Sequence, residues 1–93
     1  MIKTELNGTS MKVSIFDAID RETENELEIL VTWKLEGVTD LRFDLSGAEY
    51  ITPTIVRIIL YANKQMKNKG NITIINANEK IAKLCAAHDL YCS

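Results

Sequence analysis

The sequence predicts a single α/β domain over residues 1–93, with a mixed four-stranded sheet, the element order ββαβαβα, and helices mainly on one face. Three observations predict this class. Short alternating apolar segments are separated by longer segments with helical periodicity, the pattern of strands joined by crossover helices. A turn signal at Asn7 and Gly8 joins the first two strands as a hairpin. A length of 93 residues gives room for one core.

The first half of the chain is expected to form this hairpin and then a helix. The strands cover residues 2–6 and 11–16, and we expect a connection of more than two residues between them. Asp20 is a suitable N-cap, and a capping box starting at Thr23 is the alternative if the helix begins later. Gly37 is expected to end the helix as its C′ residue. The buried stripe should comprise Leu27, Leu30, Val31 and Leu35.

The third strand should cover residues 41–45 and lead through a loop into the second helix. Thr52 is the expected N-cap, and Pro53 suits the first helical position because its missing N–H has no partner there. The helix should run to about Asn68 and stop at Gly70. A helix of this length between two strands indicates a parallel crossover.

The fourth strand should cover residues 72–75, and Asn78 should cap a last helix. Helical spacing places four side chains on one face of that helix, namely Ile81, Leu84, Cys85 and His88. Cys85, His88 and Cys92 have the spacing i, i+3, i+7, but a structural zinc site usually needs four ligands. We therefore expect no metal site and a core position for Cys85.

Composition excludes several classes of function. Eleven Lys and Arg against thirteen Asp and Glu give a net charge of −2, whereas nucleic-acid binding needs a basic excess. The longest apolar stretch, residues 55–62, is broken by Arg57 and is too short to cross a bilayer. The N-terminal residues lack an apolar signal segment. We therefore expect a cytoplasmic protein with reduced thiols, no nucleic-acid partner and no direct membrane insertion.

No feature of the sequence indicates an enzyme. Capping and turn roles account for three carboxylates that would otherwise suggest acid–base chemistry: Asp17, Asp20 and Asp44. The sequence contains no phosphate-binding glycine motif and no nucleophile patterned beside its single histidine. We therefore expect a chain without a cofactor of its own. A small enzyme or ligand-binding domain with a cleft above the third strand remains a third, weaker interpretation.

Two segments resemble the STAS domain family, the anti-sigma factor antagonists and their relatives. They are Asp-Leu-Ser-Gly-Ala-Glu-Tyr-Ile over residues 44–51 and Gly-Asn-Ile-Thr-Ile-Ile-Asn over residues 70–76. The resemblance covers residues 11–90, nearly the whole chain. The family motif has the form D-L-S-x-x-x-x-I-D-S-S-G-L and ends where the second helix begins. The resemblance implies a STAS-like fold and a regulatory, protein-binding role.

The second half of the motif is where this chain departs from the family. The family's Asp, Ser, Ser and Gly fall on Thr52, Pro53, Thr54 and Ile55. Thr54 matches the serine that is phosphorylated in regulatory members and still carries a hydroxyl. The family's pattern before the first helix falls on residues 17–20, with Asp17 in place of Gly.

The resemblance implies that Thr54 is a phosphoacceptor and that the partner is an anti-sigma factor with serine/threonine kinase activity, which would hold the nucleotide. At the second helical position a phosphate would meet free backbone N–H groups and Arg57. The simpler interpretation, a helix start of the form Thr-Pro-Thr, stays open. The expected docking surface comprises Asp17, Asp20, Tyr50, Thr52, Pro53, Thr54, Ile55 and Arg57.

The resemblance also allows a second function. Some STAS-like proteins are non-catalytic subunits of ABC-type lipid transport complexes, and residues 70–84 are similar to those subunits as well. The same helix start would then bind the transporter ATPase, and Thr54 would never be modified.

Two features of the sequence indicate further interaction surfaces. Ile29 and Trp33 form either an exposed patch or part of a wide buried face. An uncovered strand edge toward the C-terminus would favour a homodimer.

Overall fold

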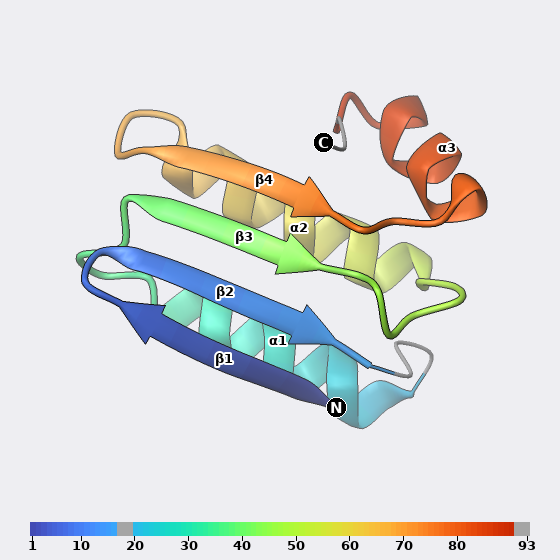
Figure 1. Ribbon diagram of the computed structural model, residues 1–93, viewed down its shortest axis with the longest axis horizontal. Coiled ribbons are helices and arrows are strands. Elements are labelled where there is room, and N and C mark those ends of the chain that lie inside the picture. Colours follow the sequence, from blue (N-terminus) through green and yellow to red (C-terminus); the bar gives the residue numbers. More distant parts are fainter. Residues whose placement is uncertain (17–19, 91–93) are drawn as a thin grey trace.

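The computed structural model describes residues 1–16 and 20–90 and has the predicted element order (Figure 1). The strands and helices are β1 (Ile2–Asn7), β2 (Ser10–Ile15), α1 (Arg21–Trp33), β3 (Asp40–Asp44), α2 (Pro53–Met66), β4 (Asn71–Ile75) and α3 (Glu79–Ala87). The prediction of an α/β fold with the order ββαβαβα is therefore confirmed.

The four strands form one mixed sheet in the order β1-β2-β3-β4. β1 pairs antiparallel with β2, whereas β2 with β3 and β3 with β4 are parallel. Helices α1 and α2 lie against the same face of the sheet, and α3 lies at its β4 end (Figure 1). The carboxyl ends of β2, β3 and β4 and the first turns of α1 and α2 therefore gather at one end of the molecule (Figure 1).

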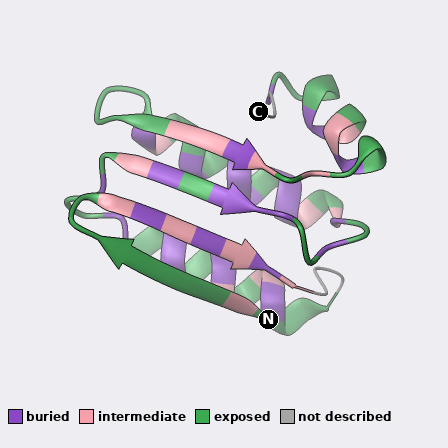
Figure 2. Cartoon of the chain, in the orientation of Figure 1, coloured by how far each residue is buried: buried purple, intermediate pink, exposed green. Residues whose placement is uncertain are grey.

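Alternation along the strands separates an apolar sheet face from a polar one. Met11, Val13 and Ile15 of β2 are buried against the helices, with Leu41 and Phe43 of β3 beside them (Figure 2). Intervening residues point to the open face, which carries Lys12, Ser14, Arg42, Asp44 and Thr73. Because one face is buried and the other polar, the strand register is strongly specified.

The hairpin connection is shorter than predicted. Asn7 pairs with Ser10, so only Gly8 and Thr9 join the strands. Gly8 has φ +65°, and Thr9 is outside the positive-φ region. Glycine at the first of two central positions is the arrangement of a type II′ turn, whose twist matches that of the flanking strands. Because this turn matches the twist of the strands, the pairing of β1 with β2 continues as far as Asn7 and Ser10.

The predicted end of α1 at Gly37 is wrong. The helix ends at Trp33, and Lys34 caps it by donating its N–H to the Leu30 carbonyl. Gly37, with φ +80°, lies in the turn that leads into β3. Leu27, Leu30 and Val31 are buried as expected, and Leu35 is buried beyond the helix end.

Gly70 lies after α2, which ends at Met66 rather than at Asn68. A Cβ atom on Gly70 would lie 1.8 Å from the Thr39 carbonyl oxygen. The neighbouring Asn71 N–H donates to that same oxygen at 2.9 Å. A glycine is therefore required at position 70, because the backbone after α2 lies directly against the backbone at Thr39 and leaves no room for a side chain.

The three predicted N-caps are confirmed. Asp20, Thr52 and Asn78 each accept a hydrogen bond from the backbone N–H three residues later. On α3, Ile81 and Cys85 are buried as predicted, whereas His88 is exposed. His88 leaves the buried face because α3 ends at Ala87 and His88 is its C-cap.

Candidate functional site

The predicted docking surface centres on the first turn of α2. The Thr52 hydroxyl accepts a hydrogen bond from the Ile55 N–H at 3.2 Å and donates to a carboxylate oxygen of Glu24 on α1 at 2.5 Å. One hydroxyl therefore closes the start of α2 and fixes it to α1. The Ile55 side chain is fully buried, so it anchors the helix start to the core and leaves the surface to its neighbours.

Among the first three residues of α2, only Thr54 has a backbone N–H without a hydrogen-bond partner within the described part of the chain. Pro53 has no N–H, and the N–H of Ile55 is occupied by Thr52. The backbone donors that the sequence predicts at this helix start are therefore fewer than expected, because Pro53 has none and that of Ile55 is occupied. The Thr54 side chain is half-buried, and it lies at the positive end of the helix dipole of α2.

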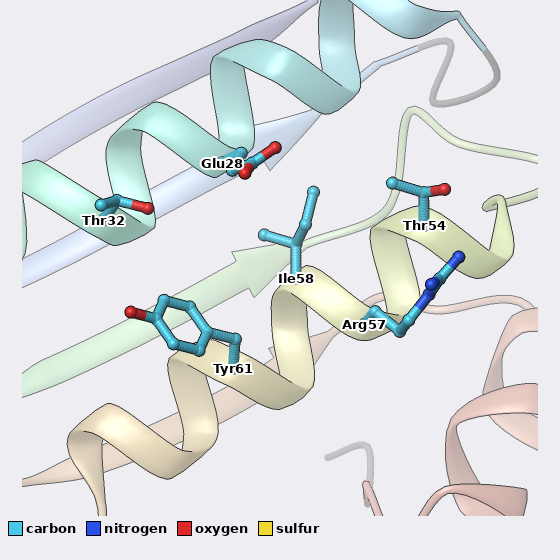
Figure 3. Close-up of a pocket in the computed structure, with 6 residues that line it drawn as sticks. All are labelled: Glu28, Thr32, Thr54, Arg57, Ile58 and Tyr61. Atoms are coloured by element: carbon cyan, nitrogen blue, oxygen red, sulfur yellow. The ribbon is translucent and has the colours of Figure 1, made fainter.

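Thr54 borders a groove of about 410 Å³ between α1 and α2 (Figure 3). The lining residues are Glu28, Thr32, Thr54, Arg57, Ile58 and Tyr61. Arg57 extends from α2 on the Thr54 side, and Glu28 faces the groove from α1 (Figure 3). Arg57 forms no ion pair within the described part of the chain. The groove beside the Thr54 hydroxyl therefore contains one positively charged side chain, Arg57, and one negatively charged side chain, Glu28.

Sequence reasoning overlooked Glu24, Glu28 and Tyr61. Their spacing in the sequence could have indicated them: Glu28 follows Glu24 by four residues, and Tyr61 follows Thr54 by seven. Such spacings place side chains on one helix face. Only the packing of α1 beside α2, which the sequence does not specify, brings those two faces together.

The loop between β3 and α2 is held by Asp44, which is buried. Its carboxylate accepts hydrogen bonds from the Ser46 N–H at 3.0 Å and from the Asn76 side-chain amide at 3.2 Å. Lys12 Nζ lies 3.5 Å from the other carboxylate oxygen. The Ser46 N–H bond is the main cause that lowers the pKa of Asp44, despite the opposing effect of burial. The predicted turn role of Asp44 is confirmed.

The other predicted surface residues have different positions. Tyr50 is exposed, and it lies between Glu49, whose carbonyl accepts from the Asn78 side chain at 2.8 Å, and the buried Ile51. Asp20 is exposed, and its carboxylate accepts from the Thr23 N–H at 2.8 Å. Hydrogen bonding from Thr23 lowers the pKa of Asp20. Asp17 lies outside the described residues.

No helix in the described part of the chain is long and apolar enough to cross a membrane. Residues 1–16 and 20–90 contain no cluster of three His, Cys, Asp or Glu side chains placed to hold a metal ion. Cys92, one of the three residues considered for such a site, lies outside these ranges.

Comparison with known proteins finds the same fold but no sequence match. No family model and no curated protein matches the sequence. Among solved structures, unphosphorylated SpoIIAA, an anti-sigma factor antagonist, has a TM-score of 0.84 at 10% identity, covering 100% of this chain and 87% of that one. Phosphorylated SpoIIAA from Bacillus has a TM-score of 0.83 at 12% identity, covering 97% and 85%. A serine-to-glutamate variant of RsbS from Moorella thermoacetica has a TM-score of 0.78 at 11% identity, covering 99% and 85%.

These similarities define the class of the fold. The chain has the STAS fold of the anti-sigma factor antagonists, and the fold similarity extends over essentially the whole chain. The predicted STAS-like fold is therefore confirmed. At 10–12% identity the similarity concerns the backbone arrangement.

Proposed function

We propose that this chain is a cytoplasmic regulatory module that binds a protein partner through the first turn of α2, and that Thr54 is the residue whose phosphorylation ends binding. The proposed docking surface comprises Tyr50, Thr52, Pro53, Thr54 and Arg57, and the proposal also includes Asp17 and Asp20 as partner-binding residues. The partner is a kinase-type anti-sigma factor, which supplies the nucleotide. The chain itself contributes a surface and an acceptor hydroxyl.

The observation that carries this proposal is the setting of Thr54. Its hydroxyl is on a half-buried side chain at the positive end of α2, beside an unpartnered N–H and one turn before Arg57. A phosphoryl group adds about −1.5 to −2 charges and is stabilised at helix N-termini and by arginine. The fold similarity adds support, because one of the similar structures is of SpoIIAA in its phosphorylated form.

Phosphorylation would act through charge, without refolding. The groove has Arg57 on one side and Glu28 on the other, and Glu24 is bound to Thr52 nearby. A phosphate would engage Arg57 and make the surface strongly acidic. A partner surface that accepts the unmodified helix start would then be repelled by like charge and by the added bulk.

A binding experiment with the proteins encoded beside this chain tests the proposal. We expect Thr54→Glu to weaken the complex at least about tenfold, since it adds negative charge and bulk at the centre of the proposed interface. Thr54→Val keeps the shape without the hydroxyl and should bind normally. ATP should release the wild-type chain but not the Thr54→Val variant. Thr73→Glu, on the open sheet face, is the matched control and should leave binding unchanged.

If the Thr54→Glu variant still binds the partner normally, the α2 start is rejected as the docking surface.

A second candidate function is favoured by the acidic residues of α1. Glu28 lines the groove and Glu24 is bound to Thr52, so both oppose a further negative charge at Thr54. In that case the chain would be an accessory subunit that docks on an ABC transporter ATPase and is never modified. A stable complex with an ATPase, unaffected by added phosphate donors, would identify this function.

A further inference from the structure

The outer edge of β1 is a long and uncovered strand edge. β1 lies at one end of the strand order, and every residue from Lys3 to Asn7 is exposed (Figure 2). Among these residues, Leu6 is a large apolar side chain that is 63% exposed, although its cross-strand partner Met11 on the same face of the sheet is buried. Uncovered edges present unpaired N–H and C=O groups, which readily pair with another strand.

The ladder between β1 and β2 fixes which backbone groups of β1 point outward. Met1 and Phe16 exchange both backbone hydrogen bonds, at 2.8 and 3.1 Å. In an antiparallel pair such bonded positions alternate with non-bonded ones. Lys3 and Glu5 therefore direct their backbone groups to β2. Those of Ile2, Thr4 and Leu6 point outward, free to pair with a further strand.

The side chains of β1 are self-complementary about Thr4. The segment reads Ile-Lys-Thr-Glu-Leu over residues 2–6. Paired antiparallel with itself about Thr4, it places Lys3 opposite Glu5 and Ile2 opposite Leu6, in both directions. The outward-pointing groups then face one another, and the charged pairs occupy the non-bonded positions, where opposing side chains lie closest.

Charge selects this register over its neighbours. Moving the centre of the pairing by one residue, to Lys3 or to Glu5, shifts the register by two residues. Each of these registers sets two like charges directly opposite each other. Within the described part of the single chain, neither Lys3 nor Glu5 forms an ion pair, although Lys3 Nζ lies 5.9 Å from the centre of the Phe16 ring. Both charges are therefore available to a second strand.

Helix α1 extends the same surface below the strand edge. Ile29 and Trp33 are 53% and 78% exposed, so of the two sequence-based interpretations the exposed patch is correct. Ile29 lines a groove together with Ile2 and Thr4 of β1. Trp33 follows Ile29 by one helical turn and lines a second groove with it, and at the helix end Trp33 also borders Gln65 and Met66 of α2. Glu24 and Glu28 face α2: Glu24 is bound to Thr52, and Glu28 lines the groove beside Thr54.

We propose that β1 pairs antiparallel with the β1 strand of a second copy of this chain, centred on Thr4, so that two sheets join into one. The helices of both copies lie on the same side of the joined sheet. Because α1 lies behind β1 and β2 (Figure 1), the two α1 helices come together beneath the seam and cover Ile29 and Trp33. This surface is separate from the first turn of α2, so the proposal does not depend on the proposed function.

A second copy is the favoured occupant because the pattern is symmetric. A two-fold axis requires that residue i opposes j and that j opposes i. The pairs Lys3–Glu5 and Ile2–Leu6 both satisfy this condition. An unrelated strand would need no such palindrome. The sequence-based expectation of a homodimer invoked the C-terminal side of the sheet, whereas the pattern that supports one is on β1.

Charge reversal tests the register. Sedimentation equilibrium of the full chain should give a concentration-dependent dimer. Lys3→Glu and Glu5→Lys should each weaken it at least about tenfold, since each reversal makes two symmetry-related pairs repulsive. An equimolar mixture of the two variants should restore a heterodimer, because each then supplies the charge that the other needs. Lys80→Glu on α3 is the matched control and should leave the affinity unchanged.

A backbone variant supplies an independent test. Thr4→Pro removes an N–H that points outward, so the pairing of β1 with β2 keeps its hydrogen bonds while the seam loses two. We expect this variant to be monomeric with an unchanged circular dichroism spectrum. A wild-type chain that stays monomeric at millimolar concentration would overturn the proposal, even if its β1 edge binds another protein. So would a dimer that neither the charge reversals nor Thr4→Pro weakens.

Discussion

Replacing Thr52 with alanine tests whether one hydroxyl fixes the candidate site. The substitution removes the N-cap of α2 and the hydrogen bond to Glu24. Loss of a threonine cap costs about 1 kcal/mol of folding stability. The bond to the carboxylate adds about 1 kcal/mol, which is less than the usual contribution of about 1.5–3 kcal/mol for a charged acceptor because Glu24 is half-exposed and can be hydrated.

The free energy of unfolding should therefore fall by about 2 kcal/mol, from a total of about 5–15 kcal/mol for domains in general. In a domain of this size the midpoint temperature should drop by about 10 °C. Urea unfolding followed by circular dichroism measures the loss. Thr52→Ser is the matched control, because serine keeps both bonds and should cost less than about 0.5 kcal/mol.

The coupling between the helices is isolated by a double-mutant cycle with Glu24→Ala. We expect an interaction energy of about 0.5–1.5 kcal/mol, the range for groups joined by one hydrogen bond. Additive effects would mean that Thr52 caps α2 without fixing it to α1. A Thr52→Ala variant as stable as the wild type, or a Thr52→Ser variant as unstable as Thr52→Ala, would refute the reasoning altogether.

Three further predictions follow from single residues. Gly70→Ala should cost at least about 2 kcal/mol in urea unfolding, because its Cβ would meet the Thr39 carbonyl; a near-neutral result would contradict that close approach. The lowered pKa of Asp44 means that its stabilising contribution is complete above the unfolded pKa of about 3.9 and is lost as the pH falls through the folded pKa. In the Asp44→Asn variant, the free energy of unfolding should therefore decrease less as the pH falls below about 3.9. An unchanged pH dependence in urea unfolding would reject this stabilising role of Asp44. Trp33→Ser should change the stability of the monomer by less than about 0.5 kcal/mol, because 78% of that side chain is already exposed; a large loss would place Trp33 in the core.

Much of the fold follows from local signals in the sequence. Asp20, Thr52 and Asn78 are capping residues placed directly before helical periodicity, and all three cap helices in the structure. Apolar alternation in β2 and β3 identified the buried sheet face. These signals succeed because each depends on residues within one helical turn or one strand.

The errors occur where distant segments decide the outcome. Gly37 is a suitable helix terminator, but α1 stops at Trp33, and Gly37 instead lies in the turn that leads into β3. Gly70 resembles a simple helix stop, and its second role appears only when Thr39 lies against it. The partnership of Thr52 with Glu24 depends on the packing of α1 beside α2, which no local pattern encodes.

The candidate site was predicted in outline but not in its electrostatics. The position of Thr54 at the start of α2 was predicted. The sequence analysis did not predict that Pro53 and the Thr52 cap leave fewer free N–H donors there. The acidic side of the groove, supplied by Glu28, was also missed. The balance between Arg57 and these carboxylates therefore decides how strongly a phosphate is held.

The central claim is that Thr54 is the acceptor at a partner-binding helix start. Its most direct test is the intact mass of the chain after incubation with ATP and its binding partner, with the modified residue located by fragmentation. We predict a gain of one phosphoryl group on Thr54 in the wild-type chain and none in the Thr54→Val variant. A phosphoryl group on another residue, or a stable complex in which the chain stays unmodified, would contradict the claim.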